Sequence, residues 1–184
     1  MILLRHGESE FNRQFSVTRQ DPGIHDPALT EHGRQQVQDA AAALAEVPIS
    51  RIIVSPYTRA LETAEKLAAL LAVPITIAPL VRERFAFACD IGSPRSELEQ
   101  RWPEHDFSGL AEIWWPGEAE PHDDVIGRAA RFRAEMAADD DAGRCLVVSH
   151  WGFILALTGE SIANGSWLRC DPAAKPPAAL VWKP

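Results

Sequence analysis

The first residues of the chain, Met1-Ile2-Leu3-Leu4-Arg5-His6-Gly7-Glu8, decide the fold that we expect. Four apolar residues lead directly into a cation, an imidazole and a glycine, and a short apolar run bounded by glycine predicts a fully buried strand. Such a strand delivers Arg5 and His6 to the carboxyl edge of a sheet, where open α/β sheets bind their ligands. Gly7 lets the backbone turn sharply or approach a bulky anion there. The stretch therefore predicts an anion site at the end of the first strand.

The composition indicates one globular domain over residues 1–184. Hydrophobic residues make up 46% of the chain and charged residues 24%, and this length suffices to bury a core without metals or disulfides. Cys89, Cys145 and Cys170 form no CxxC pair, so we expect free thiols. No apolar stretch approaches the roughly 20 residues of a membrane span. Met1 already begins the first strand, which leaves no room for a signal peptide, and we expect a cytoplasmic protein.

The charge balance argues against two classes of partner. A formal net charge of −8 disfavours both nucleic acid and acidic membrane surfaces. An anionic ligand would therefore need a local cluster of arginines that acts against the overall field.

Hydrophobic periodicity predicts alternating strands and helices after the opening strand. The strand, helix, strand order favours parallel pairing with right-handed crossovers, which is the α/β class. Residues 9–24 are polar and are expected to form a loop. We expect strands at residues 52–54, 75–77 and 146–148 and short ones near 166–170 and 180–182, with helices from Thr30 to about 44, from Thr58 to about 71, from about 123, and at 153–157.

The regular pattern stops between residues 80 and 122, in a segment rich in aromatic residues and prolines. A long irregular segment inside a compact domain is usually functional, and its aromatic content argues against disorder. We therefore expect a lid or insert over about residues 80–122. Trp114 and Trp115 within it fit packing as well as substrate recognition.

Reactive side chains follow several of the expected strands. Arg5 and His6 follow the first strand, Arg59 the second and His150 the strand at 146–148, and a glutamate, Glu83, comes soon after the third. Because parallel strands share one carboxyl edge, these groups can meet around one pocket. Arginines and histidines can hold a phosphoryl group, an imidazole can attack phosphorus, and a carboxylic acid can protonate the leaving oxygen.

These residues resemble the histidine phosphatase superfamily, also called phosphoglycerate mutase-like. The resemblance spans nearly the whole chain, and four blocks in combination are far more specific than any single one. The blocks are Arg5-His6-Gly7-Glu8-Ser9 followed by Asn12; Leu29-Thr30 with Gly33; Ser55-Pro56 followed by Arg59-Ala60 and Thr63-Ala64; and Val148-Ser149-His150.

The resemblance implies a three-layer fold, with helices on both faces of a mostly parallel sheet, and a role for each matching position. His6 would be the nucleophile, and Arg5, Arg59 and His150 would bind the phosphoryl group and stabilise its transition state. Glu83 matches the proton donor of the branch that supplies a glutamate after the third strand, and Glu8 is a second candidate for this acid. Ser9 and Asn12 match positions that line the phosphate pocket. The resemblance implies no metal and no organic cofactor.

The chain departs from the family pattern in three places. Trp151 replaces the glycine usual after the second histidine, and we expect its ring to narrow or stack on the substrate pocket. Phe85-Ala86-Phe87-Ala88-Cys89 replaces a glycine-rich stretch common after the acid. The paired arginines and proline run typical of phosphoglycerate mutases are missing, which favours hydrolysis over transfer between hydroxyls.

The sequence thus predicts a metal-independent phosphatase that acts on a small phosphorylated substrate through a phosphohistidine. A phosphoglycerate mutase-type phosphotransferase and a phosphoryl-binding module without turnover are the alternatives. A dinucleotide-binding oxidoreductase is disfavoured because no GxGxxG follows the first strand. The other charged candidates are expected at the solvated surface, without metal-ligand spacing among the histidines: Arg13, Arg95, Arg101, His25, His32, His105 and His122.

Overall fold

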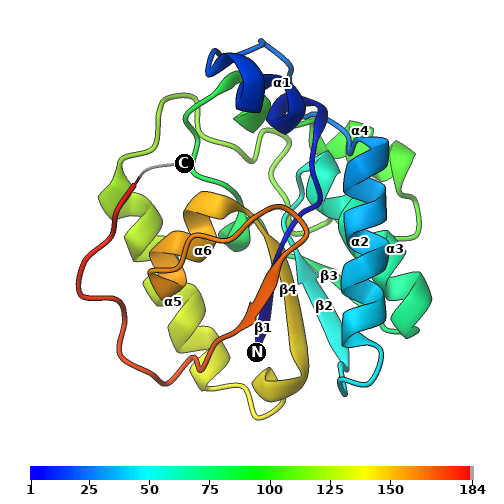
Figure 1. Cartoon of the computed structure of the whole chain (residues 1–184), viewed down its shortest axis with the longest axis vertical. Coiled ribbons are helices and arrows are strands. Elements are labelled where there is room, and N and C mark those ends of the chain that lie inside the picture. The colour runs from blue at the N-terminus through cyan, green and yellow to red at the C-terminus, as the bar shows by residue number, and fades with distance from the viewer. Residues whose placement is uncertain (183–184) are drawn as a thin grey trace.

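A five-stranded sheet carries the fold in the computed structural model, which describes residues 1–182 (Figure 1). The strands stand in the order β3-β2-β4-β1-β5. All neighbours are parallel except β5, which runs antiparallel to β1 at the edge. The mostly parallel α/β class predicted from the sequence is confirmed. The strands are β1 (Ile2–Arg5), β2 (Arg51–Val54), β3 (Ile75–Ile77), β4 (Cys145–Ser149) and β5 (Trp167–Arg169).

Helices cover both faces of this sheet and give three layers (Figure 1). The helices α2 (Glu31–Leu44) and α3 (Thr58–Leu71) pack on one face, and α5 (His122–Ala137) and α6 (Trp151–Thr158) pack on the other. Successive side chains of a strand point to opposite faces. In β1, Ile2 and Leu4 accordingly belong to the first core cluster, and Leu3 to the second.

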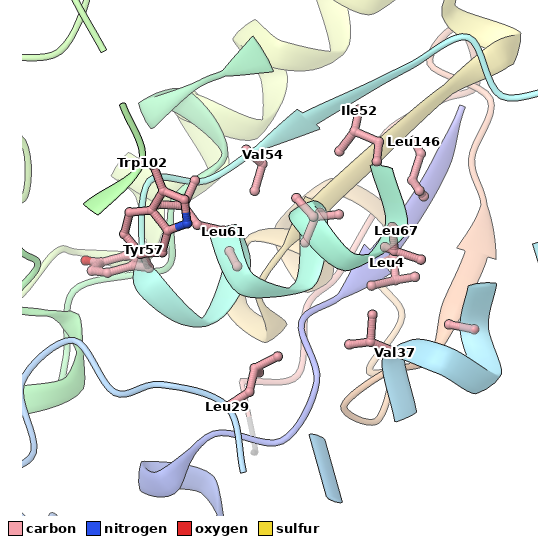
Figure 2. Packing of buried hydrophobic residues seen from close by; sticks show 14 of the residues in the cluster. Leu4, Leu29, Val37, Ile52, Val54, Tyr57, Leu61, Leu67, Trp102 and Leu146 are labelled. Atoms are coloured by element: carbon pink, nitrogen blue, oxygen red, sulfur yellow. The ribbon is translucent and has the colours of Figure 1, made fainter. Parts of the chain in front are cut away.

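The first core fixes the alignment of the central strands (Figure 2). Leu4, Ile52 and Leu146 come from three neighbouring strands and meet Leu61 and Leu67 of α3 in this cluster. All five are fully buried, and burial of one such side chain stabilises the fold by about 1.5–3 kcal/mol. Slippage by one residue would exchange the side chains that each strand packs into the two cores, so the fit of these side chains favours the observed register.

This register brings the ends of β1 and β4 together. Arg5 is paired with Ser149 as the last pair of the ladder. The next residues along the two strands are His6 and His150, and the amide of His6 donates to the carbonyl of Ser149 at 3.0 Å. The two histidines therefore leave the sheet at the same edge.

A close contact between two glycines sets the path of the chain after β1. A Cβ on Gly7 would lie 2.4 Å from the carbonyl oxygen of Gly33 in the first turn of α2. That helix begins where the sequence predicts, because the Thr30 hydroxyl caps it and accepts from the amide of Gly33 at 2.9 Å.

The helix α1 (Glu10–Thr18) corrects the prediction of a loop at residues 9–24. Ser9 caps this helix, and Oδ1 of Asn12 accepts from the amide of Ser9 at 3.1 Å. The two residues together form a capping box. Phe11 and Phe15, four residues apart, stack on one face with ring centroids 5.2 Å apart. The polar composition of residues 9–24 favoured a loop, although the cap of this helix and its pair of aromatic residues were visible in the sequence.

The segment from residue 80 to 122 is mostly irregular, as predicted, with short helical pieces. Two single-turn 3-10 helices, η1 (Pro79–Val81) and η2 (Ala88–Asp90), precede α4 (Arg95–Arg101). The helix α4 was not predicted; it spans seven residues and buries one side chain, Leu98. A third such turn, η3 (Ala142–Arg144), leads into β4.

The tail forms one of its two predicted strands. The strand expected near 166–170 is present as β5, whereas residues 180–182 form no strand. Arg133 instead holds the preceding tail residues through the carbonyls of Asp171 and Ala174, and Trp182 stacks on the ring of His122 at the start of α5. All three cysteines are free thiols. Within residues 1–182, no helix combines the length and the apolar character that crossing a membrane requires.

Candidate active site

The predicted site residues gather around one cavity of about 590 Å³ at the carboxyl edge of the sheet. The ends of β1 and β4, the first turn of α3, the start of α1 and the segment after β3 all contribute to it. His150 lies behind this lining, with its ring centroid 4.9 Å from that of His6. The predicted residues that line the cavity are Arg5, His6, Ser9, Asn12, Arg59, Glu83 and Trp151.

The ring of His6 is held in a defined tautomer. Its Nδ1 lies 2.7 Å from the carbonyl oxygen of Gly7, and a carbonyl can only accept, so Nδ1 carries the proton and Nε2 keeps its lone pair. Burial, followed by the positive charges of Arg59 and Arg5, holds the pKa of His6 well below its ordinary value. A neutral imidazole with a free Nε2 is suited to nucleophilic attack.

His150 is oriented by the hydroxyl of Ser55, a residue for which the sequence predicted no role. The Nε2 of His150 lies 2.8 Å from Oγ of Ser55. The pKa of His150 is held well below its ordinary value by burial and then by Arg59 and His6. If the Ser55 hydroxyl donates to Nε2, the proton of the neutral ring sits on Nδ1, which is buried and has no partner among the described residues.

Arg59 is a buried cation and Arg5 a half-buried one, and they are anchored to different segments. Arg5 donates from Nη1 to the carbonyl of Ile162 at 2.9 Å, and its buried Nε has no partner within the described part of the chain. Burial lowers the pKa of Arg5 to about 10, which leaves it charged at neutral pH. Arg59 donates to the carbonyl of Cys89 at 2.8 Å. Buried cations in a cavity favour an anionic ligand.

Asp90 is a member of the site that the sequence analysis missed. Its Oδ1 lies 3.1 Å from Nη2 of Arg59, and its other oxygen accepts from the amides of Ala86 and Phe87 at 3.0 Å each. Tyr57 supports the same pair, because its hydroxyl donates to the carbonyl of Asp90 and its ring lies 4.4 Å from the Arg59 guanidinium. Periodicity does not predict how the irregular segment folds, so no pattern in the sequence could place Asp90 here.

Glu83 is seated on the first turn of α6. Its Oε1 accepts from the amide of Gly152 at 2.9 Å and from that of Arg84 at 2.8 Å. A Cβ on Gly152 would lie 2.5 Å from this oxygen, so the absence of a side chain there makes room for the carboxyl group. Burial, followed by the charge of Asp90, raises the pKa of Glu83. A raised pKa suits a carboxyl group that delivers a proton near neutral pH.

Ser9, Asn12 and Asn164 form a polar border of the cavity. The Oδ1 of Asn12 accepts from the hydroxyl of Ser9 at 2.9 Å and from Nδ2 of Asn164 at 3.1 Å. With its oxygen occupied in this way, Asn12 offers its amide N–H groups to a ligand. Asn164 was not predicted; it lies in the turn before β5, and it also donates to the carbonyl of His6 at 3.1 Å.

Other candidates from the sequence lie outside this cavity. The carboxylate of Glu8 accepts from the Thr30 hydroxyl at 2.7 Å and is not among the lining groups. Trp114 is buried in the first core and packs on Tyr57 with ring centroids 4.6 Å apart. Arg13 and Arg101 are exposed, and Arg95 is half-buried.

One group of potential metal ligands occurs among residues 1–182. It comprises Glu65, Glu104 and His105, whose ligand atoms lie within 4.8 Å of one another, and none of the three lines the cavity. The Nε2 of His105 lies 2.9 Å from Glu65, which also accepts from the indole of Trp102 at 3.1 Å. These contacts already explain the cluster as structural.

The class of protein is defined by the groups that meet at this edge of the sheet. They are a pair of buried histidines, two arginines and a carboxyl group. The model of the histidine phosphatase superfamily (branch 1) matches residues 1–173, and the chain belongs to this superfamily. The resemblance found in the sequence is thereby confirmed.

Several curated relatives are similar over most of this chain. It is 34% identical over 169 residues to a bifunctional protein of Mycobacterium tuberculosis, covering 90% of this chain and 45% of that protein. It is 36% identical over 172 residues to a probable phosphoglycerate mutase of Escherichia fergusonii, covering 91% and 76%. A glucosyl-3-phosphoglycerate phosphatase of Mycobacterium tuberculosis is 28% identical over 167 residues, covering 86% and 73%. The chain thus spans less than half the length of the bifunctional relative.

The fold also agrees with solved structures. The structure of a mycobacterial glucosyl-3-phosphoglycerate phosphatase in complex with VO3 superposes with a TM-score of 0.64 at 24% identity, covering 91% of this chain and 88% of that one. At this identity the likeness establishes the shared fold.

Proposed function

We propose that the protein is a metal-independent phosphatase that hydrolyses a small phosphomonoester through a phosphohistidine at His6. The observation that carries the proposal is the geometry at this ring: Nδ1 is bonded to the Gly7 carbonyl, Nε2 has no hydrogen-bond partner among the described residues, and Arg5 and Arg59 line the same cavity. Phosphatases among the relatives of this chain support the reaction type.

In the first step, Nε2 of His6 attacks phosphorus and forms a P–N bond. The ester P–O bond breaks, its electron pair stays on the leaving oxygen, and protonated Glu83 transfers its proton to that oxygen. The alcohol leaves, and a phosphohistidine and a Glu83 carboxylate remain.

In the second step, the Glu83 carboxylate removes a proton from a water molecule, whose oxygen attacks phosphorus. The P–N bond breaks, its electron pair returns to Nε2, and inorganic phosphate is released. Glu83 is protonated and His6 is neutral again, so one turnover restores the site.

The remaining site residues would bind the phosphoryl group and stabilise the charge that develops on its oxygens. Arg5 offers its unpartnered Nε, and His150 its Nδ1–H, as donors fixed before the substrate arrives. Arg59 adds a second cation, and Ser9 and Asn12 border the pocket. Donors oriented in advance in a cavity shielded from water are the most effective way to stabilise such charge.

Trp151 would take part in substrate binding in this scheme. The chain would act as a single domain over residues 1–184 in the cytoplasm, with the segment at about 80–122 as an insert that closes the pocket. This segment supplies Glu83, Phe87 and Asp90 to the cavity.

A phosphoglycerate mutase-type phosphotransferase is the second candidate, because one relative at 36% identity is a probable phosphoglycerate mutase. The two reactions share the first step and differ in the acceptor of the second, which is water or a substrate hydroxyl. Inorganic phosphate should appear in equal amount to the alcohol for hydrolysis, and should fall short of it for transfer.

The experiment is hydrolysis of 4-nitrophenyl phosphate in the presence of a chelator by wild type, His6→Ala and His25→Ala. His25 is an exposed histidine outside the cavity and serves as the matched control. We expect release with wild type and His25→Ala, loss of at least about a thousandfold with His6→Ala, and an acid-labile phosphoryl label that requires His6. Release that survives in His6→Ala would refute the phosphohistidine, and phosphate binding without release from any ester would favour a binding module.

A further inference from the structure

Aromatic side chains line the cavity beyond the phosphoryl-binding residues. They come from α1, the segment before η2, the starts of α5 and α6, and the tail. They exceed what the proposed reaction needs at phosphorus, and they form two groups: Phe11, Phe15 and Phe87, which we call the phenylalanine cluster, and His122, Trp151 and Trp182, which we call the tryptophan cluster.

The phenylalanine cluster presents an accessible apolar surface to the cavity. Phe11 and Phe15 are stacked, and Phe87 packs against them with ring centroids 5.6 Å and 5.2 Å away. Phe87 nevertheless keeps 37% of its surface exposed. The backbone amide of Phe87 is bound by Asp90, while its ring stays partly exposed in the cavity. The ring is therefore positioned to contact a ligand rather than to fill a core.

The tryptophan cluster is held in place by its own contacts. The indole of Trp151 donates to the Ser161 hydroxyl at 2.8 Å. Trp182 stacks flat on His122, with ring centroids 4.2 Å apart and planes 3° from parallel, and meets Trp151 edge-on at 6.2 Å. Three rings in mutual contact line one side of the cavity, and side chains already ordered by their neighbours lose less entropy when a ligand binds.

Arg19 and Arg84 also line the cavity, and each makes a contact within the chain. Arg84 donates from Nε to the carbonyl of Glu120 at 2.9 Å, and the guanidinium of Arg19 lies 5.9 Å from the ring of Phe15, as in a cation–π contact. Glu83 and Asp90 line the cavity as well: Asp90 is paired with Arg59, and Glu83 is the proposed proton donor.

Resting on the proposed function, we infer that the substrate is a phosphomonoester whose alcohol carries a flat aromatic ring. The ring lies among the phenylalanine and tryptophan clusters while the phosphoryl group is held by Arg5 and Arg59. A cavity of about 590 Å³ falls within the range of about 300–1,000 Å³ of sites for whole small molecules. Aromatic pairs add to simple burial through their favourable geometry.

Binding to His6→Ala tests this inference without turnover. We would compare 2-(2-naphthyl)ethyl phosphate with propyl phosphate by titration calorimetry, because both are esters of primary alcohols and differ in the ring. We expect the naphthyl ester to bind about tenfold more tightly or better. Equal affinities, or tighter binding of 3-phosphoglycerate, which carries a second anionic group, would overturn the inference.

Variants locate the effect. Phe15→Leu and Trp151→Leu, each made in the His6→Ala background, should reduce the ratio of naphthyl ester affinity to propyl phosphate affinity about threefold to tenfold. Val17→Ala is the matched control, because Val17 lies on the same helix as Phe15 and is 83% exposed. An unchanged preference in both cavity variants would contradict the assignment of the two clusters.

Turnover of the same two esters by wild type separates the inference from the function on which it rests. Preferential binding without phosphate release would refute the hydrolysis and support the aromatic preference. Hydrolysis of both esters with equal kcat/KM and equal affinity would support the hydrolysis and refute the preference.

Discussion

Arg59 and Asp90 form an ion pair in which both side chains are buried. The side chain of Arg59 is 4% exposed and that of Asp90 is 2% exposed, with 3.1 Å between Nη2 and Oδ1. The same carboxylate binds the amides of Ala86 and Phe87. A single acidic residue therefore connects the cation expected to bind phosphate with the segment expected to bind the rest of the substrate.

Replacement of Asp90 by asparagine should destabilise the protein. The variant keeps the shape of the side chain but leaves the buried charge of Arg59 without its partner, which costs roughly 3 kcal/mol of unfolding free energy. Urea unfolding measures the loss, and hydrogen exchange at the amides of Ala86 and Phe87 should become faster. Asp140→Asn, at an exposed acidic residue of the turn before β4, is the control. Equal stability of the two variants would contradict a structural role for the pair.

Gly152→Ala should impair turnover with little effect on stability. The new Cβ would lie 2.5 Å from Oε1 of Glu83, and the end of that side chain is the part that can move. We expect kcat to fall at least about tenfold, because a displaced acid no longer reaches the leaving oxygen. Gly127→Ala in α5 is the control: a Cβ there meets nothing within 4 Å, and helix propensity should raise the unfolding free energy by up to about 1 kcal/mol. Full activity of Gly152→Ala would argue against this seat for Glu83.

Glu83→Gln should discriminate between leaving groups. Glutamine cannot donate a proton as an acid, so alkyl phosphates, whose leaving alcohols need protonation, should lose about a hundredfold or more in kcat, and 4-nitrophenyl phosphate far less. The raised pKa of Glu83 also predicts that wild-type activity on alkyl phosphates falls as the pH rises through that pKa, because the acid loses its proton. Equal losses for good and poor leaving groups would exclude Glu83 as the donor.

The buried histidines should make stability depend on pH. The pKa values of His6 and His150 are held well below their ordinary value, so the unfolded chain takes up protons on them below about pH 6.5 and the folded chain does not. The unfolding free energy should therefore fall from pH 7 to pH 5, by up to about 1 kcal/mol per pH unit for each ring. Urea unfolding at both pH values should show a smaller fall for His6→Gln than for wild type or the exposed control His25→Gln. An identical fall in all three proteins would contradict the burial of a neutral His6.

The sequence predicts the elements whose pattern is strong. β1, β2 and β4 are runs of branched apolar residues, and α2 and α3 repeat apolar residues at helical spacing after Thr30 and Thr58. Since parallel strands share a carboxyl edge, the meeting of His6 with Arg59 and His150 followed from the order of the elements alone.

The remainder depends on tertiary contacts that no period encodes. α1 is polar overall and is held by its cap and its phenylalanines. Asp90 pairs with Arg59 from an irregular segment whose path is set by hydrogen bonds. Trp182 stacks on His122, which is far away in the sequence, and does not belong to a strand. Asp90 and Asn164, which were missed, lie in irregular segments, whereas His6 and His150 directly follow predicted strands.

The position of β1 in the sheet also affects how the protein is made. This strand is synthesised before the other four strands of the sheet, yet its neighbours are β4 and β5, which span residues 145–149 and 167–169. Pairing between segments so far apart in the chain is slow. Until it occurs, the apolar side chains of β1 are exposed to solvent. A nascent chain that ends before β4 carries His6 but lacks His150 and the strand that pairs with β1, so the pocket assembles only after β4 has been synthesised.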